Sequence, residues 1–128
     1  MTRFFIERSQ NTPLVKFEEG VMLISGRCIP ENALLFFEPV FKFISDYGIK
    51  PDPMTELNIM LEYANSSTNR SLMTIFTLFE KIYENDNNVS INWFYESGDD
   101  LMYELGVDFK ALLRIPFSIH ERESLKEK

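Results

Sequence analysis

The sequence contains one cysteine and one histidine among its 128 residues. Because an internal disulfide needs two thiols, Cys28 alone excludes the disulfide framework of small secreted domains. Clusters of cysteine and histidine with the spacing of metal ligands are missing as well. No charged-then-apolar leader precedes Phe4, which favours a reducing cytoplasm as the location. We therefore expect a cytoplasmic protein with no metal site and no cofactor.

Motifs of the common catalytic sites are also missing. The chain has no phosphate-binding P-loop, no GxGxxG dinucleotide pattern and no GxSxG nucleophile motif. The lone His120 falls in the last predicted strand, where a single histidine is more often structural than catalytic. An active site would require Glu31, Asp46 or His120 to converge in a deep cleft, and nothing in the sequence predicts this. We expect a protein that is not an enzyme.

Long apolar runs and excess positive charge are absent too. The longest apolar run, Ala33–Phe37, is far shorter than the roughly 20 residues that span a bilayer. The formal charge is −7, from 20 acidic and 13 basic side chains, which repels phosphate backbones. Membranes and nucleic acids are therefore not expected as partners.

What the sequence does contain is enough apolar material for one folded domain. At 128 residues with 45% apolar side chains, the chain can bury a core without metals or disulfides. We assign residues 1–120 to this domain. Residues 121–128 are mostly charged, and we expect them to form a frayed tail.

The first half of the chain predicts a hairpin and a long helix. A short edge strand is expected at Phe4–Glu7, followed by a hairpin with Gly20 at the position that needs a positive φ angle. The segment Ala33–Tyr47 predicts a largely buried helix with Pro30 and Glu31 in its first turn and a kink at Pro39. The hairpin strands are Leu14–Phe17 and Val21–Ser25.

The second half alternates strands and helices. Glu56–Ala64 predicts a strand covered on both faces, since Met60 and Ala64 lie on its more polar side. The other predicted elements are a helix from Ser67 to Glu84, a strand at Val89–Tyr95, a helix at Leu101–Leu113 and a strand at Ile115–His120. A hairpin followed by such alternation predicts an α/β fold with a mixed, mainly parallel sheet and about three helices.

The strand-to-helix junction within Leu57–Glu84 is the main candidate for a functional site. It contains the hydroxyl-rich run Asn65-Ser66-Ser67-Thr68 at the start of a helix, where free N–H groups bind anions or a phosphorylated side chain. Helix capping alone also explains such residues, because any of the first three is a good N-cap. The junction therefore fits a phosphorylation switch, or a module that binds a small anionic molecule.

Three other features each have two interpretations. Cys28 could have a lowered pKa before a helix, although a small buried side chain is the more common explanation. Glu31 and Asn32 could contact a partner, or could serve the helix start locally. The pair Asp99-Asp100 could bind a cation, but adjacent acids at a helix start are usually a cap.

Several segments of the chain together match the pattern of one protein family. Gly26–Asn32 forms a Gly-x-Cys-x-Pro-Glu-Asn box, and the aromatic-rich segment Phe36–Val40 follows it. The two resemble the Gly-x-Ser-x-Pro-Glu-Asn box and aromatic-rich helix of the SiaC-like family of bacterial regulatory phosphoproteins. The resemblance continues through Ser9–Pro13, Tyr63–Phe79 and Ile91–Trp93, and covers roughly Phe5 to Ile119. Cys28 and Ile29 stand where the family usually has Ser and Tyr. The resemblance implies a fold like that of the STAS-type anti-sigma factor antagonists.

The resemblance also implies a function. Members are partner-switch proteins in which a Ser/Thr protein kinase phosphorylates a hydroxyl and a PP2C-type phosphatase removes the phosphate. The unphosphorylated form binds and activates a diguanylate cyclase, in cyclic-di-GMP signalling linked to biofilm regulation. On this chain the acceptor becomes Ser66, with Ser67 and Thr68 as alternatives. The partner-binding residues implied are Pro30, Glu31, Asn32, Asn65, Ser66, Ser67, Thr68 and Arg70.

Overall fold

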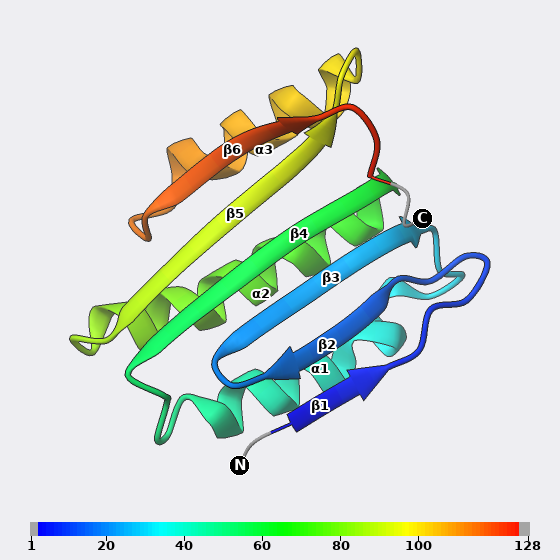
Figure 1. Ribbon diagram of the computed structural model, residues 1–128. Coiled ribbons are helices and arrows are strands. Elements are labelled where there is room, and N and C mark those ends of the chain that lie inside the picture. Colours follow the sequence, from blue (N-terminus) through cyan, green and yellow to red (C-terminus); the bar gives the residue numbers. More distant parts are fainter. Residues whose placement is uncertain (1–2, 126–128) are drawn as a thin grey trace.

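A six-stranded sheet forms one layer of the molecule, and three helices form the other (Figure 1). The computed structural model describes residues 3–125. The strands follow the order of the sequence across the sheet: β1–β3 are antiparallel, and β3–β6 are parallel. The elements are β1 (Arg3–Ile6), β2 (Leu14–Glu18), β3 (Val21–Cys28), α1 (Ala33–Tyr47), β4 (Met54–Ala64), α2 (Ser66–Glu84), β5 (Asn88–Glu96), α3 (Asp100–Leu112) and β6 (Phe117–Arg122). The predicted α/β class, the hairpin and the three helices are confirmed.

The hairpin between β2 and β3 has the predicted tight turn. Glu18 pairs with Val21, and the two residues between them, Glu19 and Gly20, have φ angles of 52° and 83°. Two successive positive φ angles are typical of the type I′ turn, whose twist matches that of the strands it joins. A local choice of turn residues therefore sets the register of the antiparallel half of the sheet.

All three helices cover the same face of the sheet, as Figure 1 shows. Each crossover from β3 to β6 advances by one strand in the same direction, so right-handed connections place every helix on one side. The prediction that β4 is covered on both faces is wrong for this reason. Its residues Asn58, Met60 and Glu62 lie half-exposed on the open face, while Leu57, Ile59 and Leu61 are buried under the helices.

Helix α1 begins later than expected and continues through its proline. Its N-cap is Asn32, so Pro30 and Glu31 lie in the preceding loop and not in the first turn. Pro39 lies inside the single helix Ala33–Tyr47. Both Pro39 and Leu35 are exposed, so water can solvate the Leu35 carbonyl that lacks its helical donor.

Helix α3 packs on the sheet through a glycine. A Cβ atom at Gly106 would lie 2.5 Å from Cδ1 of Trp93. The Trp93 indole Nε1–H also donates to the Met102 carbonyl of the same helix at 2.9 Å. Gly106, which weakens a helix by its propensity, therefore allows α3 to approach the largest buried side chain.

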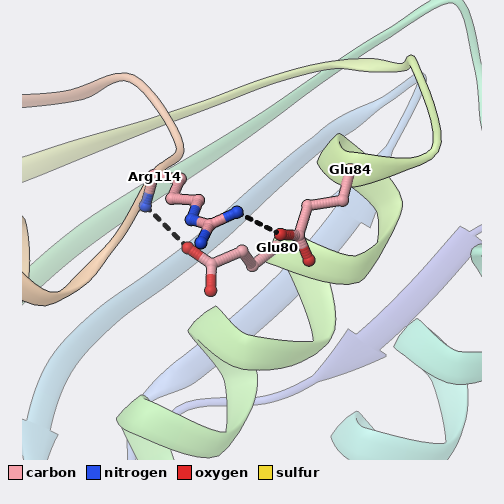
Figure 2. Close-up of polar contacts among 3 residues, drawn as sticks. All are labelled: Glu80, Glu84 and Arg114. Carbon is pink, nitrogen blue, oxygen red and sulfur yellow. Dashed lines mark hydrogen bonds and ion pairs between the residues drawn. The ribbon is translucent and has the colours of Figure 1, made fainter.

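The connection between α3 and β6 is attached to the end of α2, as Figure 2 shows. The Arg114 backbone N–H donates to Glu80 Oε2 at 2.6 Å, and its guanidinium lies 3.3 Å from Glu84 Oε2. Strand β6 then continues to Arg122, two residues past the predicted domain boundary at 120. Leu125 is buried, and its N–H donates to Glu96 Oε1 at 2.9 Å. Residues 126–128 of the predicted tail lie outside the described part of the chain.

Within residues 3–125, no helix combines the length and the apolar character that a membrane-spanning segment needs.

Candidate functional site

Two helix starts meet at the carboxyl edge of the sheet. Strands β3 and β4 are parallel neighbours, and their last residues, Cys28 and Ala64, pair with each other. Helices α1 and α2 begin directly after these strands, at the N-caps Asn32 and Asn65. The first-turn N–H groups of both helices therefore lie at this edge of the sheet.

The two asparagines are both used as caps. The Asn32 Oδ1 accepts a hydrogen bond from the Leu35 N–H at 3.0 Å. The Asn65 Oδ1 accepts two bonds, from the Thr68 N–H and from the Ser67 hydroxyl, both at 2.9 Å. These bonds stabilise the first turns of α1 and α2 and hold both helix starts in place.

The three consecutive hydroxyls after Asn65 have different environments. Ser66, the first residue of α2, is exposed, and its hydroxyl has no hydrogen bond within residues 3–125. Ser67 is half-buried and donates to the Asn65 cap. Thr68 is fully buried, and its hydroxyl donates to the Cys28 carbonyl at 3.2 Å. Of the three candidate hydroxyls, only that of Ser66 is both exposed and free of hydrogen bonds in this conformation.

Cys28 is a buried structural side chain. It is fully buried and its Sγ donates to Thr68 Oγ1 at 3.5 Å. Burial raises the pKa of the Cys28 thiol to about 11, although the hydrogen bond with Thr68 acts in the opposite direction. The idea of a lowered thiol pKa is therefore wrong, because desolvation of the buried thiolate outweighs the hydrogen bond with Thr68.

A pocket of about 390 Å³ lies between the starts of α1 and α2. Four of the predicted partner-binding residues line it: Glu31 and Asn32 from the α1 start, and Ser67 and Arg70 from α2. Pro30 is buried and Ser66 directly precedes the pocket residue Ser67, but neither of them lines the pocket. The fold thus brings the two predicted segments, some 35 residues apart in the sequence, to one place.

Sequence reasoning missed part of this surface. The pocket is also lined by Ala33, Leu34, Phe41, Ser71 and Thr74. Next to it, Leu34 and Leu35 are 62% and 65% exposed. The signal for them was present, because two adjacent leucines in the first turn of α1 cannot both face the core of an amphipathic helix.

A third segment of the family resemblance packs against the same edge. The carbonyl of Asn11, in the turn Ser9–Pro13, accepts from the Ile29 N–H at 2.9 Å. Nearby, Arg8 Nη2 donates to the Ser25 hydroxyl at 2.8 Å. The turn therefore supports the loop that leads into α1.

The residues considered for catalysis do not converge. Asp46 forms an ion pair with Lys42 at 3.0 Å near the end of α1, far along the helix from Glu31. His120 lies on the open face of the sheet, with its Nε2 3.0 Å from Asn92 Oδ1. The Asp99 carboxylate accepts from the Met102 N–H and serves as the α3 cap. Among residues 3–125, no group of three or more His, Cys, Asp or Glu could hold a metal ion.

Comparison with protein families identifies this arrangement. The family described as SiaC family regulatory phosphoprotein matches residues 6–122. The chain belongs to the SiaC family. The matched residues include the starts of α1 and α2 and the whole sheet except residues 3–5 of β1. The expectation of a regulatory, non-enzymatic protein agrees with this family.

Relatives in Pseudomonas aeruginosa match over nearly their whole length. A protein of strain UCBPP-PA14, described as uncharacterized, is 26% identical over 125 residues, covering 96% of this chain and 99% of the relative. The structure of SiaC of P. aeruginosa superposes with a TM-score of 0.87 at 26% identity, covering 95% of this chain and all of the other. The predicted STAS-like α/β fold of the SiaC family is confirmed.

A second solved structure contains a partner protein. It is a crystal structure of the diguanylate cyclase SiaD in complex with its activator SiaC, both from P. aeruginosa. Its SiaC chain is 26% identical with a TM-score of 0.87, and the match covers 93% of this chain and 99% of that one. In that relative, a SiaC-family protein binds and activates an effector enzyme.

Proposed function

We propose that this chain is a bacterial cytoplasmic partner-switch regulator controlled by reversible phosphorylation of Ser66. A Ser/Thr protein kinase adds the phosphate and a PP2C-type phosphatase removes it. The unphosphorylated form binds and activates a diguanylate cyclase, and so raises cyclic-di-GMP in a pathway of biofilm regulation. The carrying observation is that Ser66, alone among the three hydroxyls of the run Ser66–Thr68, is exposed and free of hydrogen bonds, directly before Ser67 at a pocket formed by two helix starts.

The position of Ser66 suits a switch that leaves the fold intact. As the first residue of α2 it lies outside the core, so modification requires no unfolding. A phosphate adds about −1.5 to −2 charges and is accepted well at the positive end of a helix. The added charge lies one residue before Ser67 and one helical turn before Arg70, which both line the pocket. Phosphorylation therefore changes the surface offered to a partner.

The SiaD–SiaC complex of P. aeruginosa supports a diguanylate cyclase as the partner class. The features that would receive such a partner are the pocket residues Glu31, Asn32, Ser67 and Arg70, with the exposed Leu34 and Leu35 beside them. A mixed surface of this kind, with apolar side chains next to a free guanidinium, is typical of protein interfaces.

The direct test is phosphorylation by the cognate kinase of the source bacterium, followed by tandem mass spectrometry. The wild-type chain should acquire one phosphate on Ser66, and a Ser66→Ala variant should acquire none. A Ser45→Ala variant is the matched control, since Ser45 is an exposed helical serine at the far end of α1. Modification on Ser67 or Thr68 alone, or none at all, contradicts the proposal.

The second part of the test measures binding and activation of the effector enzyme. The cognate diguanylate cyclase should bind the unphosphorylated chain in a pull-down with purified proteins and become more active with it. Both effects should be lost after stoichiometric phosphorylation and return after treatment with a PP2C-type phosphatase. Equal activation by both forms contradicts the switch.

The pocket also supports a second candidate, a module that binds a small anionic molecule. Its 390 Å³ volume, the Arg70 guanidinium and the helix start of α2 fit a phosphorylated metabolite. Thermal-shift screening with nucleotides and sugar phosphates separates the two candidates. A large stabilisation by one ligand, without kinase modification, favours the binding module.

A further inference from the structure

We infer that Arg70 is the receptor for the phosphate on Ser66, so that the switch works by withdrawing this guanidinium from the partner-binding pocket. The inference rests on the proposed function for its modification site, and adds the residue that reads the modification. It starts from the spacing of the two residues, because Ser66 and Arg70 are four positions apart on the continuous helix α2.

Residues at i and i+4 on a helix are neighbours, with Cβ atoms about 5–6 Å apart. Both side chains are exposed, so neither must leave the core for the two to meet. The order is also the favourable one, with the anion nearer the helix N-terminus than the cation. A guanidinium can bind two phosphate oxygens in parallel, which makes the pair geometrically specific.

Arg70 is available for this role. No ion pair holds its guanidinium within residues 3–125. The other charged residue that lines the pocket is Glu31, in the loop before α1, and no ion pair joins it to Arg70. Glu31 carries a single negative charge and lies on another element. A dianionic phosphate on Ser66, on the same helix as Arg70, therefore attracts the guanidinium more strongly than Glu31 does.

The consequence is a change in the charge of the pocket. Without phosphate, Arg70 and Glu31 offer a partner one cation and one anion. With phosphate, the guanidinium is held at the helix start, and Glu31 remains beside a net negative group. A partner that uses a carboxylate to bind Arg70 is then both deprived of its cation and repelled.

The contact is tested by ³¹P NMR on the full chain carrying phosphoserine at position 66, installed by genetic code expansion. A neighbouring guanidinium favours the dianion and lowers the second pKa of the phosphate, which is about 6 in an isolated phosphoserine. In an Arg70→Gln variant this pKa should rise by about half a unit at low salt, a modest shift because the site is exposed. Arg70→Lys should restore part of the difference.

The matched control is Arg27→Gln, which removes an exposed arginine of the same sheet edge from a different element, β3. It should leave the phosphate pKa unchanged. An unchanged pKa in Arg70→Gln, or an equal rise in Arg27→Gln, overturns the inference. Because the phosphoserine is installed without a kinase, this outcome is separate from a failure of the kinase to modify Ser66.

Discussion

At the residue scale, three adjacent hydroxyls differ in what they can do because a helix turns by about 100° per residue. Ser66 points to solvent, Ser67 reaches the cap, and Thr68 is buried against Cys28. All three are hydroxyl residues in one tetrapeptide, yet only the Ser66 side chain is a candidate for modification. The Thr68 side chain instead joins α2 to the end of β3. The Cys28–Thr68 contact is therefore part of the site's support and not of its chemistry.

The first prediction concerns the Cys28 thiol. Its pKa is raised from 9.0 to about 11 in the folded chain, so the unfolded chain loses this proton first as the pH rises. Above about pH 9, the free energy of unfolding should fall by about 1.4 kcal/mol per pH unit more in the wild type than in Cys28→Ala, up to about pH 11. Urea unfolding of both proteins at several alkaline pH values measures the difference.

The comparison with Cys28→Ala removes the contribution of other groups. Burial also raises the pKa of Tyr47, which titrates in both proteins and cancels. The alanine variant will be less stable at every pH because it leaves a small cavity, so only the slope with pH is compared. Parallel slopes would show that the thiol ionises equally well in the folded and unfolded chains.

At the scale of elements, the site depends on two helices that begin side by side. The loop and N-cap before α1 contribute Glu31 and Asn32, α1 itself contributes two exposed leucines, and α2 contributes Ser67 and Arg70. Neither helix start makes the pocket alone. The capping bonds of Asn32 and Asn65 fix where each helix begins, and the parallel pairing of β3 with β4 places the two starts together.

The second prediction tests the apolar part of this surface. Leu35→Asp should weaken binding of the cognate diguanylate cyclase by about tenfold or more, because a carboxylate would be buried at the interface. The fold should tolerate it, since Leu35 is 65% exposed and an acid in the first turn suits the helix dipole. Isothermal titration calorimetry gives the affinity, and the melting temperature reports the fold.

Leu112→Asp is the matched control for this variant. Leu112 is 67% exposed, but it lies at the end of α3, away from the two helix starts. Its substitution should leave the affinity unchanged, while an acid at a helix C-terminus costs a little stability. Equal loss of affinity in both variants would place the cyclase elsewhere on the molecule.

At the scale of the whole molecule, the sheet has one face under the helices and one face open. On the open face, a hydrogen-bonded chain crosses three parallel strands, from Glu56 through Asn58 and Asn92 to His120. Because the Asn92 amide oxygen can only accept, the His120 Nε2 carries the proton in this arrangement. His120 is thus a structural residue that links β6 to β5.

The third prediction concerns the hydrogen bonds that run from Glu56 to His120 across the open face. Asn92→Ala removes a donor to Asn58 and an acceptor for His120, and should lower the free energy of unfolding by about 1 kcal/mol, because the freed groups are partly solvated. Ser118→Ala is the control, since Ser118 pairs with Asn92 in the register but is exposed and makes none of these bonds. If urea unfolding gives the same free energy of unfolding for both variants, these hydrogen bonds do not stabilise the fold.

Much of this protein followed from local sequence rules. The alternation of apolar residues located the strands, Gly20 located the hairpin turn, and Asn65 and Asp99 were recognised as candidate caps. The order of these elements was enough to predict the α/β class and the parallel strands, because crossovers are right-handed. The family motifs could also be found in the sequence, because each of them lies within one short segment.

Only the tertiary structure decided which of these residues act together. The same handedness rule, applied to the strand order, left one sheet face open and made the expectation for β4 wrong. The pocket depends on a pairing between β3 and β4 that spans some 35 residues, and no local pattern encodes it. The exposure of Ser66 and the burial of Thr68 follow from how α2 is rotated against the sheet, which is set by the packing of its whole apolar face. The sequence therefore determined the elements and the hydroxyl-rich run, and the packing selected the hydroxyl.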